Sequence, residues 1–271
     1  MSMDRREFIK IAGLSAIFGL GGKGTYELLK PGQLEASEQG HGHSPEQEQG
    51  HGTAEKPAVR WAMAIDVRRF RDQDLVNRCL AACREVHNVP VFDNPKDEIK
   101  WLWTDKYEHA FPDSANEYMD DELREVPFLL LCNHCDKPPC VRVCPTKATF
   151  KRPDGIVAMD YHRCIGCRFC MAACPYGSRS FNWRDPRDGL KGRTLNPEFP
   201  TRMRGVVEKC NFCVERLAQG LKPACVEVGD GAMIFGNLSD PESDVRQILR
   251  KRTSLRRKPE LGTKPSVFYL V

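Results

Sequence analysis

Thirteen cysteines in 271 residues constrain this chain more than any other feature, because eleven of them lie between Cys132 and Cys225 in short groups. Cysteines so close in sequence are poorly placed to bridge one another as disulfides. Several thiolates in one loop can instead converge on one small inorganic object, as they do around iron–sulfur clusters. The spacing therefore predicts a cluster protein rather than a disulfide framework.

The two central groups follow the ferredoxin pattern. One reads C-x2-C-x4-C-x3-C-P over residues 132–145, and the other reads C-x2-C-x2-C-x3-C-P over residues 164–175. In two-cluster ferredoxins the first three cysteines of a run hold one [4Fe–4S] cluster and the fourth crosses to the other cluster. This rule predicts two ligand sets. The cluster-1 site is Cys132, Cys135, Cys140 and Cys174, and the cluster-2 site is Cys164, Cys167, Cys170 and Cys144.

Two shorter groups flank this region, an early pair and a late trio. By the same crossing rule, the cluster-3 site takes Cys210, Cys213 and Cys225 from the late group and Cys83 from the early pair. Cys79 is left without a partner set. With all three sets complete, we expect the neighbouring His87, His134 and His162 to be hydrogen-bond donors or surface residues. The cations Arg142, Lys147, Arg163 and Arg168 also flank the sets, where they either favour the reduced state or are simply solvated.

Two alternatives to clusters remain open from the residues alone. Structural zinc takes four cysteines in two C-x2-C knuckles, so zinc is an alternative for the third set, whereas the central groups crowd too many thiolates into one loop. A disulfide-stabilised interaction protein is the other, although an odd cysteine count disfavours it. The sequence shows no Ser/His/Asp set, phosphate loop or paired carboxylates. We therefore expect single-electron transfer without substrate chemistry in this chain.

The N-terminus carries a twin-arginine export pattern, DRREFIK at residues 4–10, followed by an apolar run at 11–20 that is too short to span a bilayer. The twin-arginine route exports folded proteins, so a cluster can be inserted in the cytosol and exported with the protein. The pattern predicts a periplasmic (extracytoplasmic) protein that associates with the membrane through partners. Residues 33–57, rich in Glu, Gln and Gly, are predicted to be a disordered linker after a signal at 1–32.

The ordered chain is predicted to be α+β, with two loop-rich ferredoxin-like units stabilised by their clusters. One unit spans 127–199 and holds two clusters, and the other combines 58–126 with 200–271 and holds one. Strands are expected near 61–67, 126–131, 156–160, 181–184 and 232–236, with helices over 74–86 and from Asp240 to about Arg250. The net charge of +4 gives no argument for nucleic acid. The basic run at 250–258 is expected to be a solvated tail.

The cysteine pattern resembles the iron–sulfur subunits of the dimethyl-sulfoxide-reductase family, which carry sixteen cysteines in four groups. The early family group reads I-D-x-x-R-C-x2-C-x2-C-x3-C, and this chain has IDVRR at 65–69 followed by Phe70. The family's last late cysteine corresponds to Gly229. The resemblance implies that three of the four ligands of one family cluster are absent, so that one cluster is lost and three [4Fe–4S] clusters remain.

Within that family, CPYGSRSFNW at 174–183 and HNVP at 87–90 are most similar to the DsrO subunits of DsrMKJOP (Hme) complexes of dissimilatory sulfur metabolism. The resemblance implies two partners, an NrfD-like integral membrane quinone subunit and a multihaem cytochrome c subunit. The alternative partner is a molybdopterin catalytic subunit, as in polysulfide or tetrathionate reductases.

Overall fold

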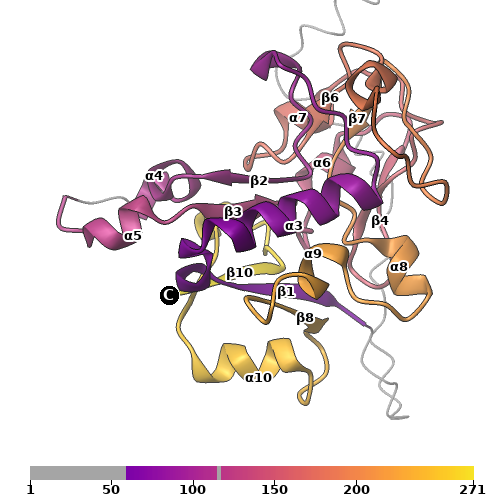
Figure 1. Ribbon diagram of the computed structural model, residues 1–271. Coiled ribbons are helices and arrows are strands. Elements are labelled where there is room, and N and C mark those ends of the chain that lie inside the picture. The colour runs from indigo at the N-terminus through magenta and orange to yellow at the C-terminus, as the bar shows by residue number, and fades with distance from the viewer. Residues whose placement is uncertain (1–58, 115–116) are drawn as a thin grey trace, which may run out of the picture. The chain divides into compact units, whose positions relative to one another are not determined.

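The computed structural model describes residues 59–114 and 117–271 (Figure 1). The predicted export signal and linker lie outside these residues. The fold is α+β and loop-rich, as predicted. Its strands are β1 Trp61–Asp66, β2 Leu102–Asp105, β3 Phe128–Leu131, β4 Thr149–Lys151, β5 Val157–Met159, β6 Ser180–Phe181, β7 Val207–Glu208, β8 Met233–Asn237, β9 Ser254–Leu255 and β10 Val267–Leu270.

The helices are short except for α3 and α10. They are α3 Gln73–Val86, α4 Tyr107–Ala110, α5 Asp121–Glu125, α6 Pro139–Arg142, α7 Phe169–Ala172, α8 Val214–Ala218, α9 Ala224–Glu227 and α10 Asp244–Lys251. Single 3-10 turns cover 67–71, 95–97, 112–114, 186–190 and 259–261. Within the described ranges, none of the helices combines the length and apolar character that crossing a membrane requires.

The largest sheet has the strand order β8-β1-β10-β9, with β1 antiparallel to β8 and parallel to β10. Side chains on β1 alternate between two faces, as the pleat of a strand requires. Ala62 and Ala64 pack with Val245 of α10, whereas Met63 and Ile65 join the main core. Figure 1 shows α10 and α3 on opposite sides of this sheet.

Helix α3 lies where the sequence predicts it. Asp72 caps its first turn, because the Asp72 side chain accepts a hydrogen bond from the Asp74 amide at 2.9 Å. Cys79 and Cys83 both lie on its buried face, one helical turn apart. The helix packs against α9, which carries Cys225. This packing brings the early cysteine pair next to the late cysteine group.

Three two-stranded ladders lead into the cysteine loops. β3 pairs with β2 and ends directly before Cys132. The hairpin of β4 and β5 separates the two central groups. β6 pairs with β7, so that the segment after Cys174 lies beside the segment before Cys210. This last pairing links the two predicted ferredoxin-like units. The division of the chain into two such units stays a prediction.

Two expectations about the C-terminal region are wrong. The last helix, α10, starts at Asp244 and not at Asp240. Asp240 instead caps a tight turn, in which its oxygens accept hydrogen bonds from the Glu242 and Ser243 amides. The basic run is not a fully solvated tail. Arg257 is buried, and its Nε donates to the Ala110 carbonyl at 2.9 Å. Arg252 forms an ion pair with Asp66.

Candidate iron–sulfur cluster sites

The cluster-3 cysteines come together from three separate segments. Cys83 lies on α3, Cys210 and Cys213 lie in the loop before α8, and Cys225 lies on α9. Burial raises the pKa of the Cys83 thiol well above its ordinary value, and the neighbouring thiols of Cys210, Cys225 and Cys213 raise it further. Four mutually close thiols from residues 83 to 225 are the arrangement that the crossing rule predicts.

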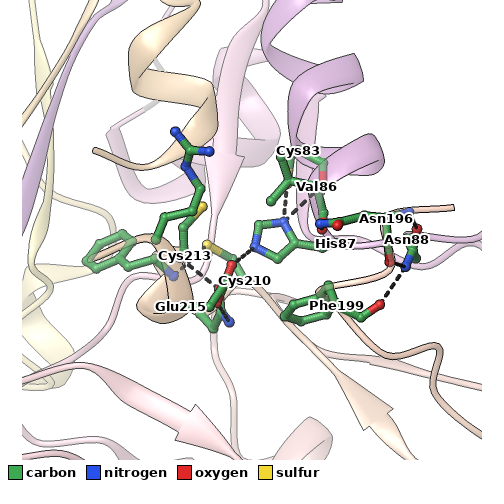
Figure 2. Close-up of polar contacts among 12 residues, drawn as sticks. Cys83, Val86, His87, Asn88, Asn196, Phe199, Cys210, Cys213 and Glu215 are labelled. Atoms are coloured by element: carbon green, nitrogen blue, oxygen red, sulfur yellow. Dashed lines mark hydrogen bonds and ion pairs between the residues drawn. The ribbon is translucent and has the colours of Figure 1, made fainter. Parts of the chain in front are cut away.

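His87 lies beside this group, as Figure 2 shows. Its ring is buried and stacks on Trp101, with the ring centroids 4.5 Å apart. Its Nδ1 lies 3.0 Å from the Cys83 carbonyl, and its Nε2 lies 2.8 Å from Oε1 of Glu215. Both ring nitrogens therefore face oxygen acceptors, in agreement with the expected role of His87 as a hydrogen-bond donor.

The ligand atoms of His87, Cys213 and Glu215 lie within 4.8 Å of one another, which is also compatible with a single metal ion. The surrounding thiols favour a different arrangement. Burial is the main reason that the pKa of Cys213 is raised, and the nearby thiol of Cys210 raises it further. Because His87 already contacts a carbonyl and a carboxylate, four thiols form the more complete donor set here.

The cluster-1 cysteines also converge. Burial raises the pKa of Cys135 to about 12, with further contributions from Cys132, Cys140 and Cys174. Burial likewise raises the pKa of Cys174, together with the thiols of Cys132 and Cys140. Cys174 is far from the other three in sequence, so its presence among them is the crossing of the fourth cysteine that the ferredoxin pattern predicts.

The cluster-2 cysteines are less buried. Cys170 on α7 packs with Cys164 and with Cys140 of the cluster-1 site in one small apolar group. Cys144 follows α6, which packs against α7. The Cys144 sulfur accepts a hydrogen bond from the Thr149 amide at 3.5 Å. Burial alone would raise the pKa of Cys144, but hydrogen bonds from Thr149 and Thr146 lower it overall. The assignment of Cys144 and Cys167 to this site stays a prediction.

The first C-x2-C pair of each of the three cysteine loops shares one backbone feature. The residue before the second cysteine has a positive φ in each loop: +40° at His134, +71° at Gly166 and +57° at Phe212. At Gly166 a Cβ atom would lie 2.4 Å from the Gly205 carbonyl oxygen, so this position requires glycine. The late loop is thus built like the two ferredoxin loops. In addition, the Phe212 amide donates to the Cys210 sulfur at 3.4 Å.

The donor chemistry of these groups fits [4Fe–4S] clusters. All thirteen cysteines are free thiols. Burial of several neighbouring thiols raises their pKa values, to about 12 for Cys210. Bound iron deprotonates coordinating thiols outright, because its positive charge reverses the local preference for the neutral form. Convergent, buried, unbridged thiols are therefore suited to hold a positively charged iron–sulfur core.

Cys79 belongs to none of the three predicted sets, although its thiol lies close enough to Cys225 of the cluster-3 site to raise the pKa of that thiol further. It is fully buried, and its sulfur donates to the Cys225 carbonyl at 3.5 Å. Burial raises the pKa of Cys79 to about 11, which favours the neutral thiol. Phe70 is also fully buried in the main core, and a Cβ at Gly229 would lie 2.8 Å from the Cys225 carbonyl oxygen. Of the positions that resemble lost ligands, position 70 therefore carries an apolar core side chain and position 229 has no room for a side chain without a shift of its neighbours.

The four cations that flank the cysteine groups in sequence follow the second of their two predicted alternatives. Arg142, Lys147, Arg163 and Arg168 are all exposed, as expected for solvated residues. The buried cations near the thiols are Arg179 and Lys209, which the cysteine motifs did not indicate. In the sequence, only the nearness of these two residues to cysteines could have indicated them, because Arg179 lies five residues after Cys174 and Lys209 directly precedes Cys210.

Comparisons with known proteins agree with this geometry. A family model for a 4Fe-4S dicluster domain matches residues 126–187, which cover both central cysteine groups. The chain is 43% identical to the Hdr-like menaquinol oxidoreductase iron–sulfur subunit 1 of Archaeoglobus fulgidus, over 98% of this chain and 97% of that protein.

Two further relatives are more distant. The menaquinone reductase iron–sulfur cluster-binding subunit of Nitratidesulfovibrio vulgaris is 36% identical, over 78% of this chain and 89% of that protein. A subunit of the tetrathionate reductase of Salmonella typhimurium is 38% identical, over 84% and 76% respectively. The fold, the convergent thiol groups and the matches to known proteins together define a [4Fe–4S] electron-transfer protein. The chain belongs to the family of iron–sulfur subunits of menaquinol oxidoreductases and related reductases, the family that its cysteine pattern resembles.

Proposed function

We propose that this chain is an exported electron-transfer subunit whose twelve grouped cysteines hold three [4Fe–4S] clusters. The observation that carries the proposal is the convergence of Cys83 with Cys210, Cys213 and Cys225, because it completes a third set of four thiols. Such clusters supply single-electron transfer when bound. The chain itself holds, orients and shields them, and we assign it no substrate chemistry.

The positions of the thiols support a linear order of the three sites. Burial is the main reason that the pKa of Cys210 in the cluster-3 site is raised. The Cys132 thiol of the cluster-1 site lies close enough to raise the pKa of Cys210 further. Cys140 of the cluster-1 site packs with Cys170 of the cluster-2 site. We therefore place the cluster-1 site in the middle, with the other two sites on either side of it.

The relatives' names, which describe a menaquinol oxidoreductase and a menaquinone reductase, support a link to quinone. In our proposal the chain relays electrons between an NrfD-like, quinone-interacting membrane subunit and further redox subunits, including a multihaem cytochrome c, of a DsrMKJOP-like complex. Sulfur metabolism is the process in which we place this complex.

The test is anaerobic purification of the native complex through a tag on this chain. A water-soluble menaquinol analogue is expected to reduce the iron–sulfur chromophore in the complex and not in the isolated chain, because the quinone site belongs to the membrane partner. Recovery of a molybdopterin subunit in place of the cytochrome would instead favour the tetrathionate-reductase type of assembly. A complex whose chromophore does not respond to menaquinol would contradict the quinone link.

Export rests on the two adjacent arginines near the N-terminus, Arg5 and Arg6. Replacing both with lysine keeps the charge but removes the twin-arginine pattern. We expect the variant to accumulate in the cytoplasm with its clusters, whereas the unchanged chain is recovered outside the cytoplasm. Cell fractionation with immunodetection measures this, and equal export of both forms would contradict the proposed route.

A further inference from the structure

Three buried cations in the described part of the chain have no carboxylate partner, namely Arg179, Lys209 and Arg257. The Arg257 guanidinium donates to the Ala110 and Tyr176 carbonyls. Arg179 is 5% exposed and Lys209 is 1% exposed, and neither forms an ion pair with a described residue. By contrast, the buried Arg202 lies 2.7 Å from the carboxylate of Glu208. An unpaired buried charge costs several kcal/mol. Hydrogen-bond acceptors or another negative charge must therefore offset Arg179 and Lys209 in the folded protein.

Lys209 is satisfied by backbone carbonyls, since its Nζ donates to the Val157 and Cys210 oxygens. Arg179 is not satisfied in this way. Its Nη1 donates to Thr149 Oγ1 at 3.1 Å, while Nε and Nη2 have no hydrogen-bond partner among the described residues. Two nitrogens of a buried guanidinium, which carry three N–H groups, are thus left to face the surrounding thiols.

Those thiols belong to two different sites. Cys140 of the cluster-1 site and Cys170 of the cluster-2 site pack together in one small core group. Burial by itself lowers the pKa of Arg179, but the adjacent thiols of Cys140, Cys170 and Cys132 raise it on balance. Arginine keeps its positive charge throughout the range in which proteins function. Thr149, which accepts from Arg179, also donates its amide to the Cys144 sulfur of the cluster-2 site. A fixed positive charge therefore lies close to predicted ligands of both sites.

We infer that Arg179 is a positioning residue shared by the cluster-1 and cluster-2 sites, donating N–H hydrogen bonds to the Cys140 and Cys170 sulfurs and raising the reduction potential at both. This inference rests on the proposed function, because it requires clusters at both sites. Reduction adds one negative charge to a site, and a nearby cation stabilises that charge most where water is excluded. Hydrogen bonds to the sulfurs act in the same direction. One side chain thus makes two neighbouring sites easier to reduce.

The test is a potentiometric titration of the iron–sulfur protein followed by electron paramagnetic resonance, which resolves a midpoint for each site. Arg179→Gln is expected to lower the two midpoints of the cluster-1 and cluster-2 sites. We expect at least a tenfold change in each redox equilibrium, which is 59 mV for a one-electron couple. The cluster-3 site serves as an internal reference and keeps its midpoint. Arg179→Lys retains the charge but loses the planar fork, so its shifts are expected to be smaller.

Arg168→Gln is the matched control. Arg168 directly follows the cluster-2 cysteine Cys167, but it is exposed and lies over the Trp183 ring at 4.7 Å. Because solvent screens its charge, the loss of Arg168 is expected to leave all three midpoints unchanged.

Three results would overturn the inference. Unchanged midpoints in Arg179→Gln with full iron content would show that the guanidinium sets neither potential. A shift at one site alone would contradict sharing between two sites. Loss of iron from both Arg179 variants would show that the side chain serves assembly. Failure of the proposed function looks different, because the unsubstituted protein itself would then contain no clusters to titrate.

Discussion

Replacing Cys213 with alanine is expected to abolish one [4Fe–4S] cluster and leave the other two intact. Cys213 lies among Cys83, Cys210 and Cys225, and it is buried like Cys83 and Cys225. Alanine offers no ligand, so three thiols remain for a cluster that needs four. Iron is expected to fall from about twelve per chain toward about eight. Elemental analysis and electron paramagnetic resonance measure the loss, and the signals of the two remaining clusters should keep their intensity.

Cys79→Ala is the control for this experiment. Cys79 is buried nearby, and its sulfur donates to the Cys225 backbone carbonyl. We expect the Cys79→Ala protein to keep about twelve irons, because its thiol belongs to none of the three sets. Loss of iron in Cys79→Ala, or full retention in Cys213→Ala, would show that the ligands of the third site have been assigned wrongly.

The second large effect is expected at Glu208, which is fully buried and forms the centre of a polar network. Its carboxylate accepts from Trp101 Nε1 at 2.8 Å and from Asn182 Nδ2 at 2.7 Å, and it lies 2.7 Å from Arg202. Glu208→Gln leaves the Arg202 guanidinium buried without a counter-charge. Breaking one partner of such a pair costs about 3–5 kcal/mol. We expect the thermal midpoint to fall by about 10 °C, as followed by loss of the visible chromophore.

Asp188→Asn provides the matched control, because it removes the same charge from an exposed pair in which Asp188 lies 2.8 Å from Lys191. Surface pairs contribute little, so the midpoint should hardly change. A double variant, Glu208→Gln with Arg202→Met, is expected to recover part of the loss, since no unpaired charge then remains. Equal midpoints for Glu208→Gln and Asp188→Asn would contradict a structural role for the buried network.

Local patterns in the sequence were sufficient to predict the elements that carry ligands. The segment 61–67 was predicted to be a strand and forms β1, and the spacing of Cys79 and Cys83 predicted that they share one face of α3. The ferredoxin pattern predicted that Cys174 would lie beside Cys132 and Cys140, which the structure shows. These predictions succeeded because each depends on spacing within one short segment or on one established crossing rule.

Features that depend on distant segments could not be predicted. The strand β10 is only four residues long, and it becomes a strand because it pairs with β1, some 200 residues earlier. Arg257 looks like part of a solvated basic run, yet its donors meet the Ala110 and Tyr176 carbonyls. Arg179 likewise comes close to both Cys140 and Cys170 only because α6 and α7 pack together in the folded chain. Tertiary contacts, rather than local preference, decide each of these cases.

The most direct test of the account is quantitative iron and acid-labile sulfide analysis of the anaerobically purified protein, with cluster type assigned by Mössbauer spectroscopy. Three cubane clusters on the twelve grouped thiols give about twelve irons and twelve sulfides per chain. About sixteen irons would mean that a fourth cluster is present despite Phe70 and Gly229, and a colourless protein containing zinc would contradict the electron-transfer function itself.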